Sequence, residues 1–370
     1  MIEPLFRDSA PDIEITRAEG NYIFDGKGRK YLDFMMGWCV GNAGWNKKTL
    51  MKAINSFRGP VYVNPTSKYK RWEILAKKLV SLMPGKDYTC LRATGGTESV
   101  ELALKTSIAY NRRKKFIAFN GAYHGQSLAC LSLVGTHEDK FGPYPETVRL
   151  STEWQSAKDN AIRAIKKGDI SAFISEPILC NLGVLVPPQD FFKEIQEACN
   201  DTDTVFIMDE VATGFGRTGK MFDFEHCKLK PDIVAIAKGF SSGYAAIGST
   251  IVSGKVAESM RFDFSNYSTF GWHPVSVECA LANMDYLKKL IGPSAKSGRL
   301  LSEQLSEFCQ PEGKGLCIGF EEKNSKIVSE CLGAGLIVCL MGNRLVLYPA
   351  LDVGKTEIEK ACAIIQRYHK

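Results

Sequence analysis

Short apolar runs alternate with amphipathic segments through the middle of the chain, and this alternation limits the possible fold more than any other feature. Between about Cys90 and Ser253, strand-like runs such as KFIAFN, SLACLSLVG, SAFISEP and TVFIMDE are separated by helical patterns such as TESVELALKTSIAYN and DFFKEIQEACN. Such alternation is typical of a mostly parallel sheet with helices on both faces. Ligands of these sheets bind beyond the carboxyl ends of the strands, so the residues after those ends are the functional candidates.

The remainder of the chain predicts a second, smaller unit. HPVSVECALANMDYLKKL, from His273, has the pattern of a long helix that leaves the sheet, and short strands and two helices are predicted after it. The N-terminal hairpin NYIFDGKGRKYLDF has no sheet of its own. We therefore expect an N-terminal segment (1–45) that packs on the small domain, a large domain (46–272), and a linker helix with a small α+β domain (273–370).

Composition excludes several classes of function. The chain has 370 residues, 45% of them hydrophobic, and its net charge of +6 comes from interleaved basic and acidic residues. No run is long and apolar enough to cross a membrane, and the N-terminus does not resemble a secretion signal. The twelve cysteines occur singly and lack zinc-ligand spacing. We expect reduced thiols, no metal site, no nucleic-acid or membrane partner, and a cytoplasmic location.

Two glycines and a threonine open a predicted helix in RATGGTESVELA. The free backbone amides and the dipole at a helix start favour an anion, and the Thr97 hydroxyl adds a hydrogen-bond donor. A plain glycine turn with Thr97 as the N-cap is the alternative reading of the same residues.

Charged residues end two of the apolar strands. TVFIMDE ends on Asp209 and Glu210, and IVAIAK ends on Lys238. A carboxylate at the end of a buried strand is costly to desolvate unless it meets a cation or a donor. Neighbouring strand ends thus bring together a carboxylate, an amine and an anion site. The carboxylate suits a cationic ring, the amine suits an aldehyde, and the anion site suits a phosphate. Pyridoxal 5′-phosphate has all three groups, and Lys238 would hold it as a Schiff base.

A fourth strand end carries an aromatic residue. FNGAYHGQSL places Tyr123 and His124 directly after the strand KFIAFN. An aromatic ring at this point can stack on the face of the cofactor, whereas simple packing of the turn is the alternative.

Six motifs in the same order make the sequence similar to the class III aminotransferases of fold type I, over nearly the whole chain. They are GGTESVELALK, GAYHG, FGPYPETVRL (a loop in the family), SEPI, the block from MDEVATGFGRTG to PDIVAIAKG, and STFGWHPVSVECALA. The resemblance implies a pyridoxal-phosphate enzyme close to acetylornithine and ω-amino-acid transaminases. It also implies a homodimer with shared active sites, because the last motif resembles a segment that reaches the neighbouring subunit's cofactor.

The resemblance gives each motif residue a role. Lys238 is the Schiff-base lysine, and Asp209 pairs with the pyridine nitrogen. The other expected cofactor contacts are Gly96, Thr97 and the partner's Thr269 at the phosphate, Val211 and Tyr123 on the two ring faces, and Glu176 and His124 behind them. Trp38 stands where relatives have a wall of the substrate pocket, although a tryptophan in the core is the alternative.

The sequence departs from the family where relatives bind a substrate carboxylate. Many relatives that use α-carboxylate substrates have an arginine three residues before a proline near the C-terminus, where this chain has Val346. Arg344 lies two residues away, on the same face of the expected strand, and is the candidate replacement. The other possibility, which we favour, is looser recognition of amines without an α-carboxylate, together with a small keto acid such as pyruvate.

The sequence thus predicts an aminotransferase that moves an amino group from an amine or ω-amino acid to pyruvate or 2-oxoglutarate. It would work by a ping-pong mechanism with Lys238 as the Schiff-base lysine. One alternative is an isomerase of the same fold, either a glutamate-1-semialdehyde 2,1-aminomutase or an amino-acid racemase. Another is a relative that binds ligands without catalysis, against which the intact Lys238 and Asp209 argue. A Rossmann dehydrogenase is disfavoured because no GxGxxG follows the first strand.

Overall fold

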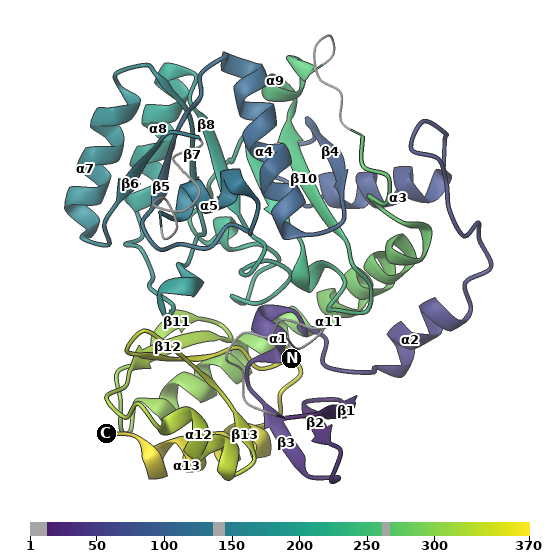
Figure 1. The fold of residues 1–370 in the computed structure, drawn as a ribbon, viewed down its shortest axis with the longest axis vertical. Helices are drawn as coiled ribbons and strands as arrows, with labels where there is room; N and C mark the ends of the chain where they lie inside the picture. The colour runs from purple at the N-terminus through teal and green to yellow at the C-terminus, as the bar shows by residue number, and fades with distance from the viewer. Residues whose placement is uncertain (1–12, 136–144, 261–266) are drawn as a thin grey trace, which may run out of the picture.

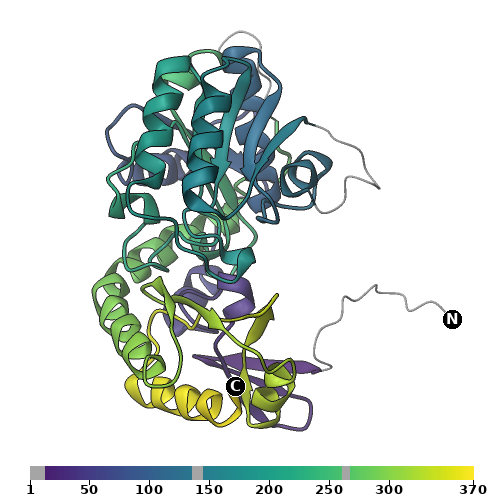
Figure 2. The same cartoon turned by 90° about the vertical axis from the view of Figure 1, so that its left-hand side faces the viewer.

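The molecule has two lobes joined by one long helix, α11 (Pro274–Leu305), as Figures 1 and 2 show. The computed structural model describes residues 13–135, 145–260 and 267–370. The larger lobe contains the central sheet, and the smaller lobe combines the N-terminal strands with the C-terminal part of the chain.

A seven-stranded sheet forms the centre of the large lobe. In spatial order its strands are β4 (Tyr88–Ala93), β10 (Gly248–Ser253), β9 (Ile233–Ile236), β8 (Val205–Asp209), β7 (Ile170–Ser175), β5 (Lys115–Phe119) and β6 (Thr147–Leu150). Strand β10 runs antiparallel to both of its neighbours, and all other pairs are parallel. The mostly parallel sheet expected from the sequence is therefore confirmed.

Successive residues of the central strands face two different cores. In β8, Phe206 and Met208 belong to one hydrophobic cluster, whereas Val205 and Ile207 belong to another. The strand is buried on both faces, which explains its unbroken apolar sequence. One face is covered by α4 (Gly96–Asn111), α5 (Leu128–Val134) and α9 (Gly254–Ala257), and the other by α3 (Lys70–Val80), α7 (Trp154–Ile165), α8 (Phe191–Thr202) and the start of α11.

Two segments of the large lobe differ from the sequence-based expectation. SLACLSLVG forms helix α5 rather than a strand, because the Ser127 hydroxyl caps its start and Gly135 ends it in the left-handed conformation. The end of FGPYPETVRL forms the edge strand β6, which pairs with β5. A four-residue strand is too short to give a periodic pattern of its own.

The small lobe contains two four-stranded sheets. The first consists of β11 (Glu312–Lys314), β12 (Cys317–Glu321), β15 (Arg344–Leu347) and β14 (Cys339–Met341), all antiparallel. The second joins the N-terminal β1 (Ile15–Glu19), β2 (Tyr22–Asp25) and β3 (Lys30–Asp33) to β13 (Leu336–Ile337). Helices α12 (Ile327–Gly333) and α13 (Lys355–Tyr368) complete the lobe. The division of the chain after residues 45 and 272 stays a proposal, which this pairing of β3 with β13 supports.

Five short helices belong to the connections between these elements. They are α1 (Met36–Cys39), α2 (Lys48–Asn55), η1 (Cys180–Leu182), η2 (Asp223–His226) and η3 (Lys238–Phe240). Three of them, α1, η1 and η3, supply residues to the site described below.

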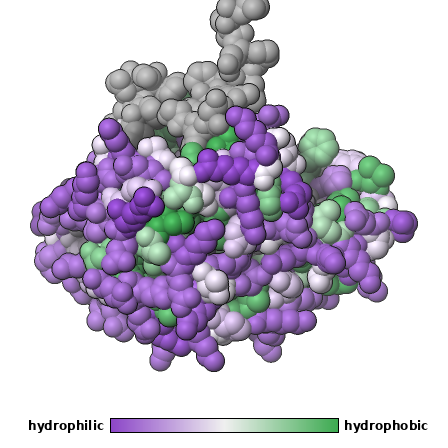
Figure 3. All heavy atoms as spheres, turned by 90° about the horizontal axis from the view of Figure 1, so that it is seen from below, coloured by the Kyte–Doolittle hydropathy of each residue, from purple (hydrophilic) through white to green (hydrophobic). Residues whose placement is uncertain are grey.

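The surface seen from the small-lobe end is mostly hydrophilic, with small apolar groups scattered over it (Figure 3). Within the described ranges no helix has both the length and the apolar character needed to cross a membrane. All twelve cysteines are free thiols.

Candidate active site

A cavity of about 810 Å³ lies beyond the carboxyl ends of the sheet strands, where the two lobes meet. Its walls come from the ends of β5, β7, β8 and β9, from the start of α4, and from residues of α1 and the small lobe. This is the position at which a sheet of this topology binds its ligand.

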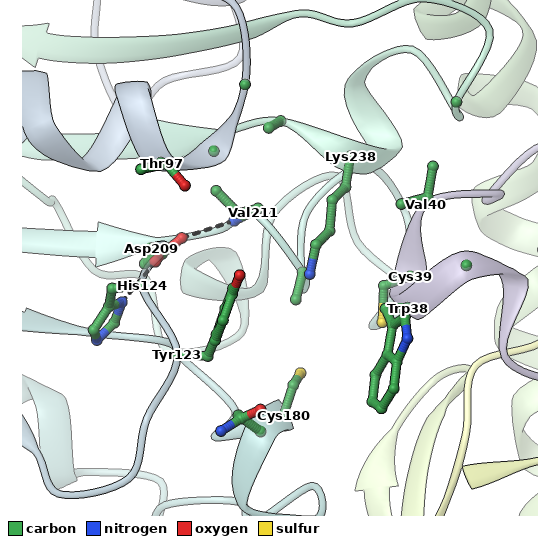
Figure 4. A pocket seen from close by; sticks show the side chains of 18 of the residues that line it. Trp38, Cys39, Val40, Thr97, Tyr123, His124, Cys180, Asp209, Val211 and Lys238 are labelled. Atoms are coloured by element: carbon green, nitrogen blue, oxygen red, sulfur yellow. Dashed lines mark hydrogen bonds and ion pairs between the residues drawn. The ribbon is translucent and has the colours of Figure 1, made fainter. Parts of the chain in front are cut away.

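Lys238 and Asp209 reach the cavity from neighbouring strands. Asp209 is the last residue of β8, and Lys238 begins η3 two residues after the end of β9. The backbone of Lys238 has φ 42°, in the left-handed region that a residue with a side chain seldom adopts. Figure 4 shows the Lys238 side chain extending into the space between Tyr123 and Trp38.

A buried histidine holds Asp209. The distance between His124 Nδ1 and Asp209 Oδ2 is 2.7 Å, and the side chains are 0% and 3% exposed. Burial alone lowers the pKa of His124, but the hydrogen bond and the charge of Asp209 outweigh it and leave the pKa above its ordinary value. The second oxygen, Oδ1, accepts a hydrogen bond of 3.1 Å from the Val211 amide. These contacts fix the orientation of the Asp209 carboxylate.

Two further glutamates follow strand ends, and only one of them faces the cavity. Glu176, after β7, lines the cavity, and burial raises its pKa to about 7. Glu210 points away and accepts hydrogen bonds from Thr213 Oγ1 at 2.5 Å and Phe224 N at 2.9 Å. Adjacent residues of an extended chain face opposite sides, so the Asp209–Glu210 pair contributes one carboxylate to the cavity and one to packing.

The start of α4 forms a close-packed turn at the cavity. A side chain on Gly96 would place its Cβ 3.0 Å from a methyl group of Val211, and one on Gly125 would lie 2.6 Å from Thr97 Oγ1. The first amides of a helix have no partner within the helix, so the amides of Gly96 and Thr97 are donors for an anion.

Thr269 lies near this turn but outside the cavity of its own chain. It is exposed, and with Tyr267 and Phe270 it borders an open depression that shares the turn from Thr94 to Thr97 with the cavity. Thr269 thus does not line the cavity that its own chain forms, and its expected contact with a partner's cofactor stays a prediction.

Figure 4 shows Val211 beside Asp209, and Tyr123 next to the end of the Lys238 side chain. Val211 and Tyr123 both line the cavity, and Tyr123 is 40% exposed. A flat ring between them would have one aromatic and one aliphatic face contact.

An unusual turn places Trp38 on the opposite wall. Four consecutive residues, Met36 to Cys39, have φ between 45° and 64°, so the chain makes a left-handed turn. The turn directs Trp38 and Cys39 to the cavity, whereas Met36 is fully buried. Trp38 is 49% exposed, so it is not a core residue.

Arg344 does not line the cavity. Its Nε donates to the Gly183 carbonyl at 2.7 Å, and its side chain forms an ion pair of 2.9 Å with Glu312. Side chains alternate between the two faces of a strand, so Arg344 and Val346 do lie on the same face of β15. At the Arg344 end of the strand, however, this face packs against the loop after η1. The structure therefore does not bring the candidate carboxylate-binding arginine to the site.

Several residues that line the cavity were not identified from the sequence. They include Cys39, Val40, Gln126, Cys180, Asn181, Met341 and Tyr348. Gln126 adjoins GAYHG, and Cys39 and Val40 follow Trp38, the expected pocket wall. The remaining four are uncharged residues, and such residues give no local signal.

The donor set fits pyridoxal phosphate. Helix amides suit its phosphate, the Asp209 carboxylate suits its ring nitrogen, and the Lys238 amine suits its aldehyde. In residues 13–135, 145–260 and 267–370, no three His, Cys, Asp or Glu side chains gather as a metal site.

Comparison with known proteins agrees with this geometry. The family model described as aminotransferase class-III matches residues 6–368. An acetylornithine aminotransferase of Aquifex aeolicus is 32% identical over 375 residues, which cover 96% of each chain. The fold is similar to that of a Bacillus anthracis aminotransferase, with a TM-score of 0.91, 28% identity, and coverage of 100% of this chain and 96% of the other. It is also similar to a PLP-bound amine transaminase from an uncultivated Pseudomonas species, with a TM-score of 0.90, 26% identity, and coverage of 100% and 98%.

Proposed function

The chain belongs to the class-III aminotransferases, which use pyridoxal 5′-phosphate, and we propose that it transfers an amino group from an amine or ω-amino acid to a small keto acid. The family expected from the six motifs is thereby confirmed. The observation that carries the proposal is the meeting of Lys238, Asp209 and the α4 start around one cavity.

The proposed roles follow from the chemistry of each side chain. When bound, pyridoxal phosphate supplies an aldehyde carbon that bonds to amines and a ring that withdraws electrons as a substrate C–H bond breaks. Lys238 would hold the group through its side-chain amine. When not bonded to the group, the Lys238 Nζ would accept the proton released from the substrate carbon and later donate it again.

Asp209 and the residues around it orient the reaction. The Asp209 carboxylate would hold a proton at the ring nitrogen, and His124 Nδ1 holds that carboxylate at 2.7 Å. The amides of Gly96 and Thr97 would bind the phosphate, and Val211 and Tyr123 would contact the ring. Glu176 lies beside this group as a buried acid. The amino donor and the keto acid use the cavity in turn, in a ping-pong cycle.

A homodimer that completes the site is the second part of the proposal. Tyr267, Phe270 and Tyr62 are 59%, 62% and 42% exposed, and the rings of Tyr62 and Phe270 pack edge to face at 6.1 Å. Exposed aromatic residues beside Thr269 suit a surface that a second copy covers. We expect a dimer in analytical ultracentrifugation, and Thr269→Ala should weaken cofactor retention by about 1 to 3 kcal/mol. A fully loaded, active monomer would contradict this arrangement.

The cytoplasmic location stays a prediction, which the twelve free thiols support.

A spectroscopic half-reaction tests the proposed activity. An amine added without a keto acid should bleach the absorption band of the lysine-bound cofactor, and pyruvate should restore it. An isomerase of this fold would regain the band without a keto acid, and a non-catalytic relative would not lose it.

A further inference from the structure

Four of the twelve cysteines gather at one place, where the two lobes meet. Cys39, Cys180 and Cys317 are buried in the same hydrophobic cluster, and the partly buried Cys339 packs against it. They belong to four segments distant in sequence, α1, η1, β12 and β14. Packing between the lobes therefore brings together thiols that occur singly along the chain.

The sulfur atoms of this cluster are in contact. Cys180 Sγ and Cys317 Sγ lie 3.8 Å apart. The Cys39 thiol also forms a hydrogen bond with the Cys180 thiol. A disulfide needs about 2 Å between its two sulfurs, so side-chain rotation and a small movement of η1 toward β12 would close the remaining gap.

The backbone around the two sulfurs is already held in place. A side chain on Gly319 of β12 would place its Cβ 2.3 Å from the Gly183 carbonyl oxygen, so the loop after η1 lies directly against this strand. The Tyr348 hydroxyl donates to the Cys180 carbonyl at 3.2 Å. Groups held together in this way react with little further loss of entropy.

The two thiols differ in their access to the cavity. Cys180 lines the cavity and is 7% exposed, whereas Cys317 is fully buried and lies behind it. Cys39 and Cys180 are both shown at the cavity in Figure 4. A small oxidant that enters the cavity would meet Cys180, and Cys317 would be the resolving thiol beside it.

The environment of these thiols makes their oxidation slow. A hydrogen bond with Cys317 is the main influence that raises the pKa of Cys180 well above its usual value, and burial does the same for Cys39. Because the thiolate is the form that attacks an oxidant, little of either residue is reactive at neutral pH. The thiols therefore stay reduced unless an oxidant persists.

We propose that Cys180 and Cys317 form a dithiol site that a hydroperoxide oxidises to a disulfide, which ties η1 of the large lobe to β12 of the small lobe. The Cys180 sulfur bonds to one peroxide oxygen while the O–O bond breaks, which gives a sulfenic acid and one water when the oxidant is hydrogen peroxide. The Cys317 sulfur then bonds to the Cys180 sulfur, and the hydroxyl group leaves with the Cys317 proton as a second water. Two thiols are oxidised, and the peroxide is reduced to two waters.

The disulfide would change the shape of the cavity. Movement of η1 toward β12 displaces Cys180, which lines the cavity, and shifts the carbonyl that Tyr348 contacts. Lys238 and Asp209 are attached to the sheet and keep their positions. Oxidation should therefore weaken the binding of substrate more than the binding of cofactor.

Peptide mapping tests the site without reference to the proposed activity. The cofactor-loaded enzyme is treated with excess hydrogen peroxide, its remaining thiols are alkylated after unfolding, and the digest is analysed by mass spectrometry. We expect a linked peptide pair that contains Cys180 and Cys317, absent before treatment and removed by dithiothreitol. A link from Cys180 to Cys39, oxidised Cys180 without any link, or unmodified Cys180 would each overturn the proposal.

A matched pair of variants tests the effect of the disulfide on the cavity. Peroxide should lower kcat/KM of the wild type for an amine donor by about tenfold or more, because a small displacement of a cavity wall misplaces the substrate, and dithiothreitol should restore it. Cys317→Ala removes the resolving thiol, which does not line the cavity, and should resist inactivation. Cys339→Ala is the control, because the Cys339 thiol contacts its own strand at the Leu340 carbonyl, and it should be inactivated like the wild type.

Cys317→Ser provides a second form of the resistant variant if Cys317→Ala folds poorly. Inactivation of both folded variants at the wild-type rate, or full activity of the linked wild-type enzyme, would show that this disulfide does not control the cavity. If the untreated enzyme transfers no amino group, the proposed function fails, and the peptide map still decides whether the dithiol site exists.

Discussion

The two halves of the cavity are built in different ways. The half that we propose binds the cofactor, the cofactor half, comes from one sheet: Asp209 and Lys238 follow neighbouring parallel strands, and Thr97 lies at the start of a helix packed on that sheet. The half that we propose binds the substrate, the substrate half, combines α1, η1 and β14, whose residues lie far apart in sequence. The chemistry is therefore attached to a rigid scaffold, whereas the substrate wall depends on how separate segments pack.

The halves also differ in electrostatics. The cofactor half holds ionisable groups close together, with His124 and Asp209 in direct contact. The substrate half holds neutral thiols, a thioether and aromatic rings. We expect mutations in the first half to change the rate and mutations in the second to change which donor is accepted.

The largest effect is expected from Lys238→Ala. The amine that binds the cofactor and moves the proton would be lost, so kcat should fall by at least about 10⁴-fold. Lys238→Arg keeps the charge but not the nucleophilic amine, and it should be equally inactive. Steady-state kinetics measure the loss, and thermal unfolding checks the fold. Residual activity within tenfold of wild type would remove Lys238 from its assigned role.

Asp209→Asn is expected to come next. The variant should keep the cofactor but lose about 10² to 10⁴ in kcat, because a neutral amide no longer holds a proton at the ring nitrogen. His124→Gln keeps the carboxylate and serves as the control with a smaller loss. Near wild-type turnover by Asp209→Asn would contradict the proposed pairing.

The free energy of unfolding should depend on pH because of Glu176. Burial raises its pKa from the ordinary 4.5 to about 7 in the folded protein. Between these two values the folded chain holds a proton that the unfolded chain has lost, so the free energy of unfolding falls as pH rises toward 7 and stays low above it. The loss is on the order of 3 kcal/mol.

Glu176→Gln should remove this dependence. Melting temperatures measured from pH 5 to pH 8 should decline less in the variant than in the wild type. Parallel curves for the two proteins would mean that Glu176 does not carry a raised pKa.

The smallest effect is expected from Arg344→Ala, on the outer side of the substrate half. Its ion pair with Glu312 is partly exposed, so stability should fall by about 1 kcal/mol or less, as in the control Glu312→Ala. KM values for donor and acceptor should change less than about twofold. The variant, like the wild type, should prefer pyruvate to 2-oxoglutarate, because the second carboxylate of 2-oxoglutarate finds no cation to pair with. A large rise in the acceptor's KM, without change for an uncharged amine, would assign carboxylate binding to Arg344.

Local sequence was sufficient for the cofactor half. Each of its residues follows an apolar strand or opens a helix, and parallel strands necessarily bring their carboxyl ends to one edge of the sheet. The positions of Asp209, Lys238 and Thr97 at one cavity could therefore be predicted from the chain alone. Helix α5 could not, since an apolar run of this length fits a strand as well as a helix.

The sequence by itself determined the family, the cofactor and the sheet, because these depend on short motifs and on the alternation of strands and helices. Only the tertiary structure decided the substrate half. The strand pattern allowed Arg344 to face the site, but the loop after η1 and Glu312 hold it elsewhere. The left-handed turn at Trp38 and the approach of Cys180, Met341 and Tyr348 likewise arise from packing between segments distant in sequence, which leaves no periodic trace in the chain.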